Sequence, residues 1–204
     1  MNEFDIKAAN WDENKMHWDR SEAIANEIKK IIPLNKKMTA LEYGAGTGIT
    51  SFLLIDYVKE IILMDNSSEM VKVMVEKIKK SKTKNLKVLN FDIEHADYKE
   101  KKFDLIFTQM VLHHVTDIDN IVGKFYDLLN PGGFLAVADL YSEDGSFHGE
   151  GFTGHKGFDT CKLTSLLRKK GFENIKTMKC FVINKRISEN KTRDFDVFLL
   201  IANR

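Results

Sequence analysis

The sequence is poor in cysteine and proline. Among its 204 residues there are only two cysteines, Cys161 and Cys180, and two prolines, Pro33 and Pro131. Two cysteines this far apart form neither a zinc knuckle nor a redox pair, and they cannot build a disulfide framework. We therefore expect a protein of a reducing compartment, long enough to bury a sizeable core within one domain.

Neither sign of charge is in excess, and long hydrophobic runs are missing. The 31 lysines and arginines nearly balance 30 acidic residues, so a net charge of +1 gives no global field that would attract nucleic acid or an anionic membrane. The longest apolar runs, 52–55 and 197–202, are far shorter than the roughly 20 residues that cross a bilayer. Residues 1–15 hold no apolar signal segment. We expect a soluble, cytoplasmic protein that binds neither nucleic acid nor membrane.

Short apolar runs alternate with segments of helical periodicity, which is typical of βαβ units. The last part of the chain predicts a hairpin of 174–183 and 195–202, with no room for a crossover helix. The predicted fold is therefore α/β: a doubly wound, Rossmann-like sheet of seven mostly parallel strands, with an antiparallel last strand and helices on both faces. The five other strands are predicted at 39–43, 60–64, 86–91, 103–107 and 133–139.

A glycine-rich turn follows the first predicted strand, where residues 41–48 read LEYGAGTG. In an open α/β sheet the ligand lies beyond the carboxyl ends of the strands, where this turn falls. Glycine allows close approach of the backbone and positive φ angles. The spacing is Gly-x-Gly-x-Gly, whereas the dinucleotide fingerprint would need glycine in place of Ile49. A pyrophosphate-binding turn is therefore disfavoured.

Three carboxylates lie at the carboxyl ends of predicted strands near this turn. Glu42 leads into the glycines and suits a cationic group, and Asp65 ends the second strand, where a carboxylate accepts from ribose hydroxyls. Asp92 ends the third strand and is placed to accept from an exocyclic amine. Together they describe a ligand with ammonium, ribose and adenine groups and no phosphate.

At these residues the sequence resembles the class I S-adenosylmethionine-dependent methyltransferases. The resemblance covers nearly the whole chain, through the motifs EYGAGTG, ILMDNSSEM, NFDIE, FDLIFTQMVLHHV and LLNPGGFLAVAD. It implies transfer of a methyl group from S-adenosyl-L-methionine, with S-adenosyl-L-homocysteine as the product. The segment 4–12, FDIKAANWD, looks like the part that closes over the cofactor in small-molecule members.

The resemblance also implies a set of cofactor-binding residues. Four would line the methionine moiety: Glu42, Gly44, Ala45 and Gly46. Six would contact the ribose, the adenine and the methyl-donor region, in that order along the chain: Asp65 for the ribose, Asn66, Met70, Asp92 and Ile93 for the adenine, and Gln109 for the methyl donor. We accordingly divide the single domain, 1–204, into four parts: an N-terminal helical cap (1–33), a cofactor-binding core (34–140), a substrate loop (141–158), and a C-terminal helix and hairpin (159–204).

Histidines supply the candidates for a general base, which is needed only if the acceptor arrives protonated. His113 and His114 follow the fourth strand, and His148 and His155 lie in the 141–158 loop. Since adjacent residues on a turn point in different directions, we expect at most one of His113 and His114 to reach the site. His113 and His155 are the predicted catalytic residues. The spacing of the histidines supports no metal site, and none is predicted.

The expected methyl acceptor is a small molecule, and the expected assembly is a monomer or homodimer. Amino-methylating nucleic-acid enzymes of this class resemble one another in an Asp/Asn-Pro-Pro-aromatic motif, which is absent at residues 108–111, TQMV. Cytosine-C5 enzymes use a Pro-Cys nucleophile, and neither cysteine follows a proline. Two alternatives stay open: an NAD-dependent oxidoreductase on the related fold, and a non-catalytic member that binds the adenosyl cofactor or a partner protein.

Overall fold

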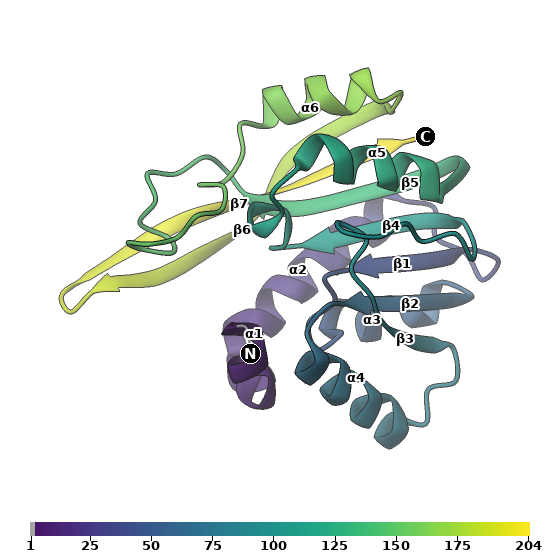
Figure 1. Ribbon diagram of the computed structural model, residues 1–204, viewed down its shortest axis with the longest axis horizontal. Helices are drawn as coiled ribbons and strands as arrows, with labels where there is room; N and C mark the ends of the chain where they lie inside the picture. The colour runs from purple at the N-terminus through teal and green to yellow at the C-terminus, as the bar shows by residue number, and fades with distance from the viewer. Residues whose placement is uncertain (1–2) are drawn as a thin grey trace.

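The computed structural model describes residues 3–204 as a seven-stranded sheet with helices on both faces (Figure 1). The strand order is β3-β2-β1-β4-β5-β7-β6. Strands β1 to β5 are parallel, and β7 is antiparallel to both of its neighbours. The predicted fold class is therefore confirmed. The strands are β1 (Thr39–Tyr43), β2 (Glu60–Asp65), β3 (Leu86–Asn90), β4 (Phe103–Gln109), β5 (Leu129–Leu140), β6 (Glu173–Ser188) and β7 (Lys191–Asn203).

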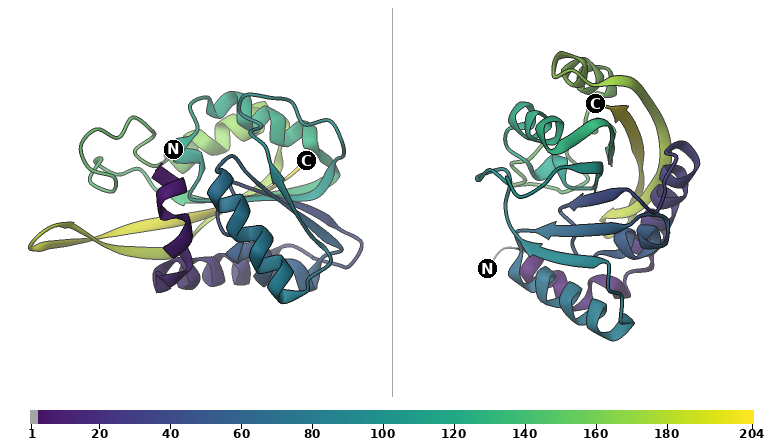
Figure 2. Two further views of the ribbon diagram at one scale, coloured as in Figure 1. Left: turned by 60° about the horizontal axis from the view of Figure 1, so that its bottom comes forward. Right: turned by 90° about the vertical axis from the view of Figure 1, so that its right-hand side faces the viewer.

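Helices cover the sheet in two layers, each over its own hydrophobic core (Figure 2). Ile28 and Met74 pack with Leu63 on one face, where α2, α3 and α4 lie. Phe125 and Leu167 pack with the other face, under α5 and α6. No helix of the described chain is long and apolar enough to cross a membrane. The helices are α1 (Glu3–Lys7), η1 (Ala8–Glu13), α2 (Lys15–Ile31), α3 (Ile49–Leu54), η2 (Ile55–Tyr57), α4 (Ser68–Ser81), η3 (Leu112–His114), α5 (Ile118–Leu128) and α6 (Thr160–Lys169).

The C-terminal hairpin is longer than its apolar runs predict. Its strands pair as far as Ser188 and Lys191, because backbone hydrogen bonds continue through charged residues whose side chains face solvent. The hairpin projects beyond the body of the sheet, beside the loop 141–158 (Figure 1). The reversed strand β7 lies inside the sheet, and β6 forms the edge. Strand β5 also starts at Leu129, earlier than the predicted residue 133.

The turn between β1 and α3 is built on glycine. Gly44, Gly46 and Gly48 have φ angles of 66°, 56° and 79°, a region that other residues rarely occupy. A side chain at Gly44 would also lie 2.4 Å from Val111 Cγ2, so this turn packs directly on the segment after β4. Behind the turn, the Glu42 carboxylate accepts hydrogen bonds from Ser51 Oγ (2.5 Å) and Ser51 N (3.2 Å) and so attaches β1 to α3.

Burial of Glu42 makes the stability of this fold depend on pH. Burial raises the pKa of the Glu42 carboxyl to about 8, against the hydrogen bonds from Ser51 that lower it. The folded chain thus keeps a proton that the unfolded chain loses near pH 4.5, so the protein loses stability as the pH rises from about 4.5 to 8. Glu42→Gln stays neutral at every pH. We expect this variant to gain stability over the wild type between pH 5 and pH 8, by at most about 5 kcal/mol.

Urea unfolding at both pH values measures this difference. Glu150→Gln, at an exposed position of the 141–158 loop, is the matched control. An identical pH dependence of the wild type and Glu42→Gln would show that Glu42 is ionised in the folded protein and would contradict the expectation.

Candidate active site

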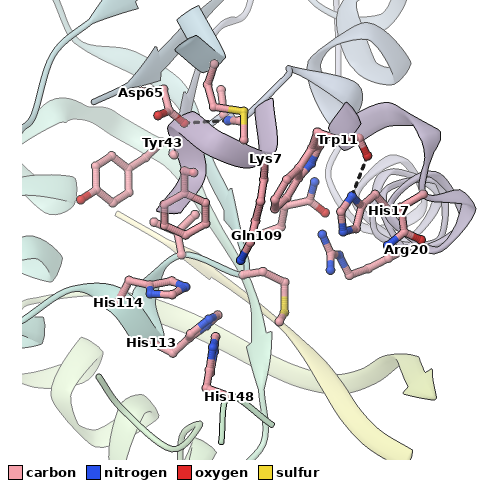
Figure 3. Close-up of a pocket in the computed structure, with 18 of the residues that line it drawn as sticks. Lys7, Trp11, His17, Arg20, Tyr43, Asp65, Gln109, His113, His114 and His148 are labelled. Atoms are coloured by element: carbon pink, nitrogen blue, oxygen red, sulfur yellow. Dashed lines mark hydrogen bonds between the residues drawn. The ribbon is translucent and has the colours of Figure 1, made fainter. Parts of the chain in front are cut away.

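A cavity of about 920 Å³ lies at the carboxyl ends of the parallel strands. The glycine turn after β1 and the ends of β2 and β4 form its base, α1, η1 and α2 form one wall, and the loop 141–158 with strand β6 forms another. Figure 3 shows Asp65 at one end of the cavity, Gln109 in the middle, and three histidines at the end away from Asp65. Segments far apart in the sequence therefore converge on one cavity.

Asp65 organises the end of the cavity nearest the glycine turn. Its carboxylate accepts from Gly46 N (2.7 Å) and from Ser67 N (2.9 Å), which joins the turn, the end of β2 and the start of α4. Burial raises the pKa of Asp65, and the backbone N–H groups counteract that rise. Each Asp65 oxygen accepts one of these two hydrogen bonds and has a second lone pair, so this cavity-lining carboxylate can also accept from a ligand's hydroxyl groups.

A second carboxylate, Asp92, stands at the mouth of the same end. Asn66 Nδ2 donates to it at 3.2 Å, and His95 Nδ1 lies 2.9 Å from it. Burial opposes ionisation of Asp92, but these hydrogen bonds together hold its pKa below the usual range. Met70 lies beneath and is almost completely buried. An apolar floor beside a carboxylate and an amide is the arrangement that suits a flat, polar-edged ring.

The N-terminal segment closes over the glycine turn. Asp12 accepts from Thr47 Oγ1 at 2.5 Å and from Lys77 Nζ at 2.6 Å, so η1 is attached to both the turn and α4. Asp5 likewise accepts a hydrogen bond from Ser67 Oγ at 2.6 Å. The segment 4–12, expected to close over a cofactor, thus lies across the cavity and contributes Trp11 to its lining.

A buried cation faces the middle of the cavity. Arg20, on α2, is 6% exposed; its recorded hydrogen bond goes to the Met16 sulfur at 3.7 Å, and its Nε has no partner in the described chain. Burial lowers the pKa of Arg20 to about 10, with Asp139 acting in the opposite direction, so the guanidinium remains charged at neutral pH. A buried charge is costly without a counter-charge. Sequence reasoning missed Arg20; its only signal was a lone arginine on an otherwise amphipathic helix rich in lysine.

Next to Arg20, Gln109 ends strand β4. Its Nε2 donates to Ser21 Oγ at 2.9 Å and to Thr50 Oγ1 at 2.6 Å, which holds α2 and α3 against the strand. Its Oε1 has no hydrogen-bond partner among the described residues. Gln109 therefore presents a carbonyl oxygen between the two ends of the cavity.

Three histidines form the end of the cavity away from Asp65. His113 and His114 come from η3 and His148 from the loop, and all three line the cavity. The expectation that only one of His113 and His114 reaches the site is wrong, because the 3-10 turn η3 brings their rings within 4.2 Å, tilted by 43°. His113 Nδ1 lies 2.6 Å from Asp139 Oδ1, and both side chains are buried.

Most of the predicted site residues line this one cavity: Gly44, Ala45, Gly46, Asp65, Asn66, Met70, Asp92, Gln109 and His113. Three do not. Glu42 lies behind the glycine turn against Ser51, and Ile93 is buried in the core under α5. His155 Nε2 donates to the Val115 carbonyl oxygen at 3.0 Å. The ring packs near Phe158, away from the cavity lining.

Known proteins share this architecture. Residues 34–171 match the family described as methyltransferase domain. An uncharacterised methyltransferase of Schizosaccharomyces pombe is 29% identical over 170 residues, covering 76% of this chain and 60% of the relative, so this chain spans about three fifths of that relative's length. The structure of YcgJ from Bacillus subtilis is similar with a TM-score of 0.76 and 16% identity, covering 90% of this chain and 98% of that one.

A third similar protein is known in complex with a cofactor. It is phosphoethanolamine N-methyltransferase 2 of Haemonchus contortus, determined with S-adenosyl-L-methionine; its TM-score is 0.73 at 17% identity, and the similarity covers 92% of this chain and 52% of that one. The match of more than half of this chain to one family, on a sheet of the same architecture, confirms the family predicted from the glycine and acidic motifs. The chain belongs to the methyltransferase domain family.

Proposed function

We propose that this chain binds S-adenosyl-L-methionine and transfers its methyl group to a small-molecule acceptor. The observation that carries the proposal is the set of groups that line one cavity: Asp92 after β3 and Asp65 at the end of β2, the buried Arg20 on the wall formed by α2, and histidines at the end away from Asp65. An extended adenosyl ligand carries adenine, ribose and then a sulfonium sulfur, from which the methyl group and the amino-acid part branch. Its adenine and ribose would lie at the carboxylates, its amino-acid part toward Arg20, and its methyl group toward the histidines.

The glycine turn fits an adenosyl ligand better than a dinucleotide. Its N–H groups are already used inside the protein: Ala45 N donates to Met64 O, Gly46 N to Asp65, and Gly48 N to Ala45 O. A pyrophosphate needs such N–H groups free to point at it. The turn still allows close approach of a ligand, because Gly44 and Gly46 carry no side chain. These contacts favour the methyltransferase interpretation over the NAD-dependent one.

Individual side chains supply the contacts that an adenosyl ligand needs. Asp65 accepts from the ribose hydroxyls, and Asp92 with Asn66 binds the edge of the adenine over Met70. Arg20 pairs with the carboxylate of the amino-acid part, which adds a counter-charge to that of Asp139 and a hydrogen-bond acceptor for the unpartnered Nε. The Gln109 carbonyl oxygen faces the positively charged sulfonium.

The cofactor supplies an electrophilic methyl group on a sulfonium sulfur. The chain then has to align an acceptor in line with that methyl and exclude water, and much of the barrier is removed by positioning alone. His113, oriented by Asp139, is placed to take a proton from an acceptor that arrives protonated. The walls formed by the N-terminal segment and the loop 141–158 enclose the cavity, which supports a small molecule rather than a polymer as the acceptor.

The first test is calorimetric titration with S-adenosyl-L-homocysteine, S-adenosyl-L-methionine and NAD. We expect both adenosyl ligands to bind and NAD not to bind. In Asp65→Ala, the affinity for S-adenosyl-L-homocysteine should fall by about 10- to 100-fold, because each hydrogen bond to a charged group contributes about 1.5–3 kcal/mol. Asp97→Ala, an exposed carboxylate outside the cavity, is the control. Binding of NAD alone would refute the proposal.

The role of Arg20 is tested with a ligand that lacks the carboxylate. Arg20→Met should lower the affinity for S-adenosyl-L-homocysteine by about 10-fold or more and leave the affinity for 5′-methylthioadenosine unchanged. Only the first ligand carries the anionic group that Arg20 pairs with. The exposed Arg168→Met is the control. Equal losses for both ligands would mean that Arg20 supports the cavity wall rather than the carboxylate.

A further inference from the structure

The three histidines at the far end of the cavity lie within metal-binding distance of one another. The ring centroid of His113 is 4.2 Å from that of His114 and 5.0 Å from that of His148, and the last two are 5.2 Å apart. One ring nitrogen of each lies within 4.8 Å of the others. Two come from consecutive residues and the third from a loop 34 positions further along (148 − 114), which is why no spacing in the sequence indicated the group.

We propose that His113, His114 and His148 bind a divalent transition metal ion, with Zn²⁺ as the best match, at the acceptor end of the cavity. Imidazole nitrogen is a preferred ligand of zinc and its neighbours in the first transition series. The three side chains are buried or half-buried, so the ion would be shielded from bulk water. The group is therefore unlike an exposed surface cluster.

Asp139 provides the second observation that points to a metal. The His113 ring donates from Nδ1 to Asp139 Oδ1, and the same carboxylate accepts from Leu140 N at 2.7 Å and His113 N at 3.2 Å. These bonds leave Nε2 of His113 as the nitrogen that carries a lone pair into the cavity. A carboxylate on the remote nitrogen of a ligating histidine is the usual support of zinc ligands, because it fixes the ring and makes it more basic.

The structure is close to the geometry that a metal requires. Zinc–nitrogen bonds of about 2.0–2.1 Å separate two tetrahedral ligands by about 3.4 Å. The nitrogens, at up to 4.8 Å, must approach by at most about 1.4 Å. His148 can supply most of this movement, since it lies on a loop, stacked on Phe152 at 3.8 Å, whereas Asp139 holds His113.

Three protein ligands leave a coordination position open to the cavity. Structural zinc sites have four protein ligands, while catalytic sites have three and keep the fourth position for water or substrate. Within the described chain the group has three members. Resting on the proposed function, we infer that this position takes an acceptor that carries a hydroxyl or thiol group.

The reaction balances without a further reagent. With its Nε2 bound to the metal, His113 would no longer be the base. The coordinated O–H or S–H would instead lose its proton to solvent at the open side of the cavity, because the metal would lower its pKa. The new bond then forms between the oxygen or sulfur and the methyl carbon as the bond from that carbon to the sulfonium breaks, with its electron pair left on the cofactor sulfur.

A second group of possible ligands, Asp92, Glu94 and His95, lies at the opposite end of the cavity. The His95 side chain is 77% exposed, and Asp92 already accepts from Asn66, so this group lacks the shielding and the supporting carboxylate of the histidine group. It serves as the internal comparison in the test.

The experiment is titration of the chelator-treated, full-length protein with Co²⁺, followed by its visible ligand-field spectrum, and with Zn²⁺ by calorimetry. We expect one ion per chain with the intense bands of four-coordinate Co²⁺. His148→Ala and His114→Ala should each lose this spectrum. Asp139→Asn should lower the affinity for Zn²⁺ by about 10- to 100-fold. His95→Ala should bind as the wild type does.

Binding of S-adenosyl-L-homocysteine, measured on the same variants, separates the outcomes. A variant that keeps this binding is folded, so its loss of Co²⁺ assigns the metal to the histidines. Wild-type protein that binds S-adenosyl-L-homocysteine but neither ion would overturn the metal site and leave the proposed function standing. Wild-type protein that binds the metal but not S-adenosyl-L-homocysteine would leave the metal site standing and overturn the proposed function. Loss of the metal in His95→Ala but not in His148→Ala would move the ion to the other group and overturn the proposal.

Discussion

The carboxylate of Asp65 holds the ligand-binding edge of this fold together. It stands at the end of β2 and accepts the N–H groups of Gly46 and Ser67, so one side chain joins the turn after β1 to the start of α4. Glycine allows the turn its positive φ angles, and contacts such as these satisfy N–H groups that have no partner in a regular helix or strand. The same bonds use the N–H groups that a phosphate would require, and they leave a carboxylate facing the cavity. The local structure of the turn and its ligand preference thus have one cause.

The cavity owes its enclosure to segments that do not belong to the sheet. Asp12 attaches η1 to the glycine turn and to α4 through Thr47 and Lys77. On the other side, the loop 141–158 is held by the long hairpin: Lys185 donates to the Phe147 carbonyl oxygen, and Phe147 packs edge-on against Phe195 at 5.1 Å. Both walls limit the access of water to the cavity, as the proposed reaction requires.

Charge is distributed along the cavity in a way that gives each end its own chemistry. The carboxylates lie at the end of β2 and after β3, the buried guanidinium of Arg20 on the wall formed by α2, and the histidines at the end away from Asp65. Asp139, buried at the end of β5, acts on two of these groups: it orients His113 through a 2.6 Å contact and favours the charged form of Arg20. Because Asp139 holds Nδ1, Nε2 is the ring nitrogen that His113 presents to the cavity.

The sequence by itself determined the sheet, its reversed strand and most of the residues that line the cavity near the glycine turn. These features depend on neighbours along the chain: the strand periods, the glycine turn at residues 44–48 and the carboxylates Asp65 and Asp92 each follow a strand, and parallel strands bring their ends to one edge. Strand ends and the length of the hairpin were less predictable, because backbone pairing continues through charged residues.

Only the tertiary structure decided the rest of the site. Arg20 reaches the cavity because α2 packs on α3 and β6, His155 turns away from it toward Val115, and Glu42 lies behind the turn rather than in it. His113 and His114 both face the cavity because a 3-10 turn follows β4, and His148 meets them because the hairpin positions the loop. Such contacts join residues distant in sequence, and their geometry depends on packing that no local pattern encodes.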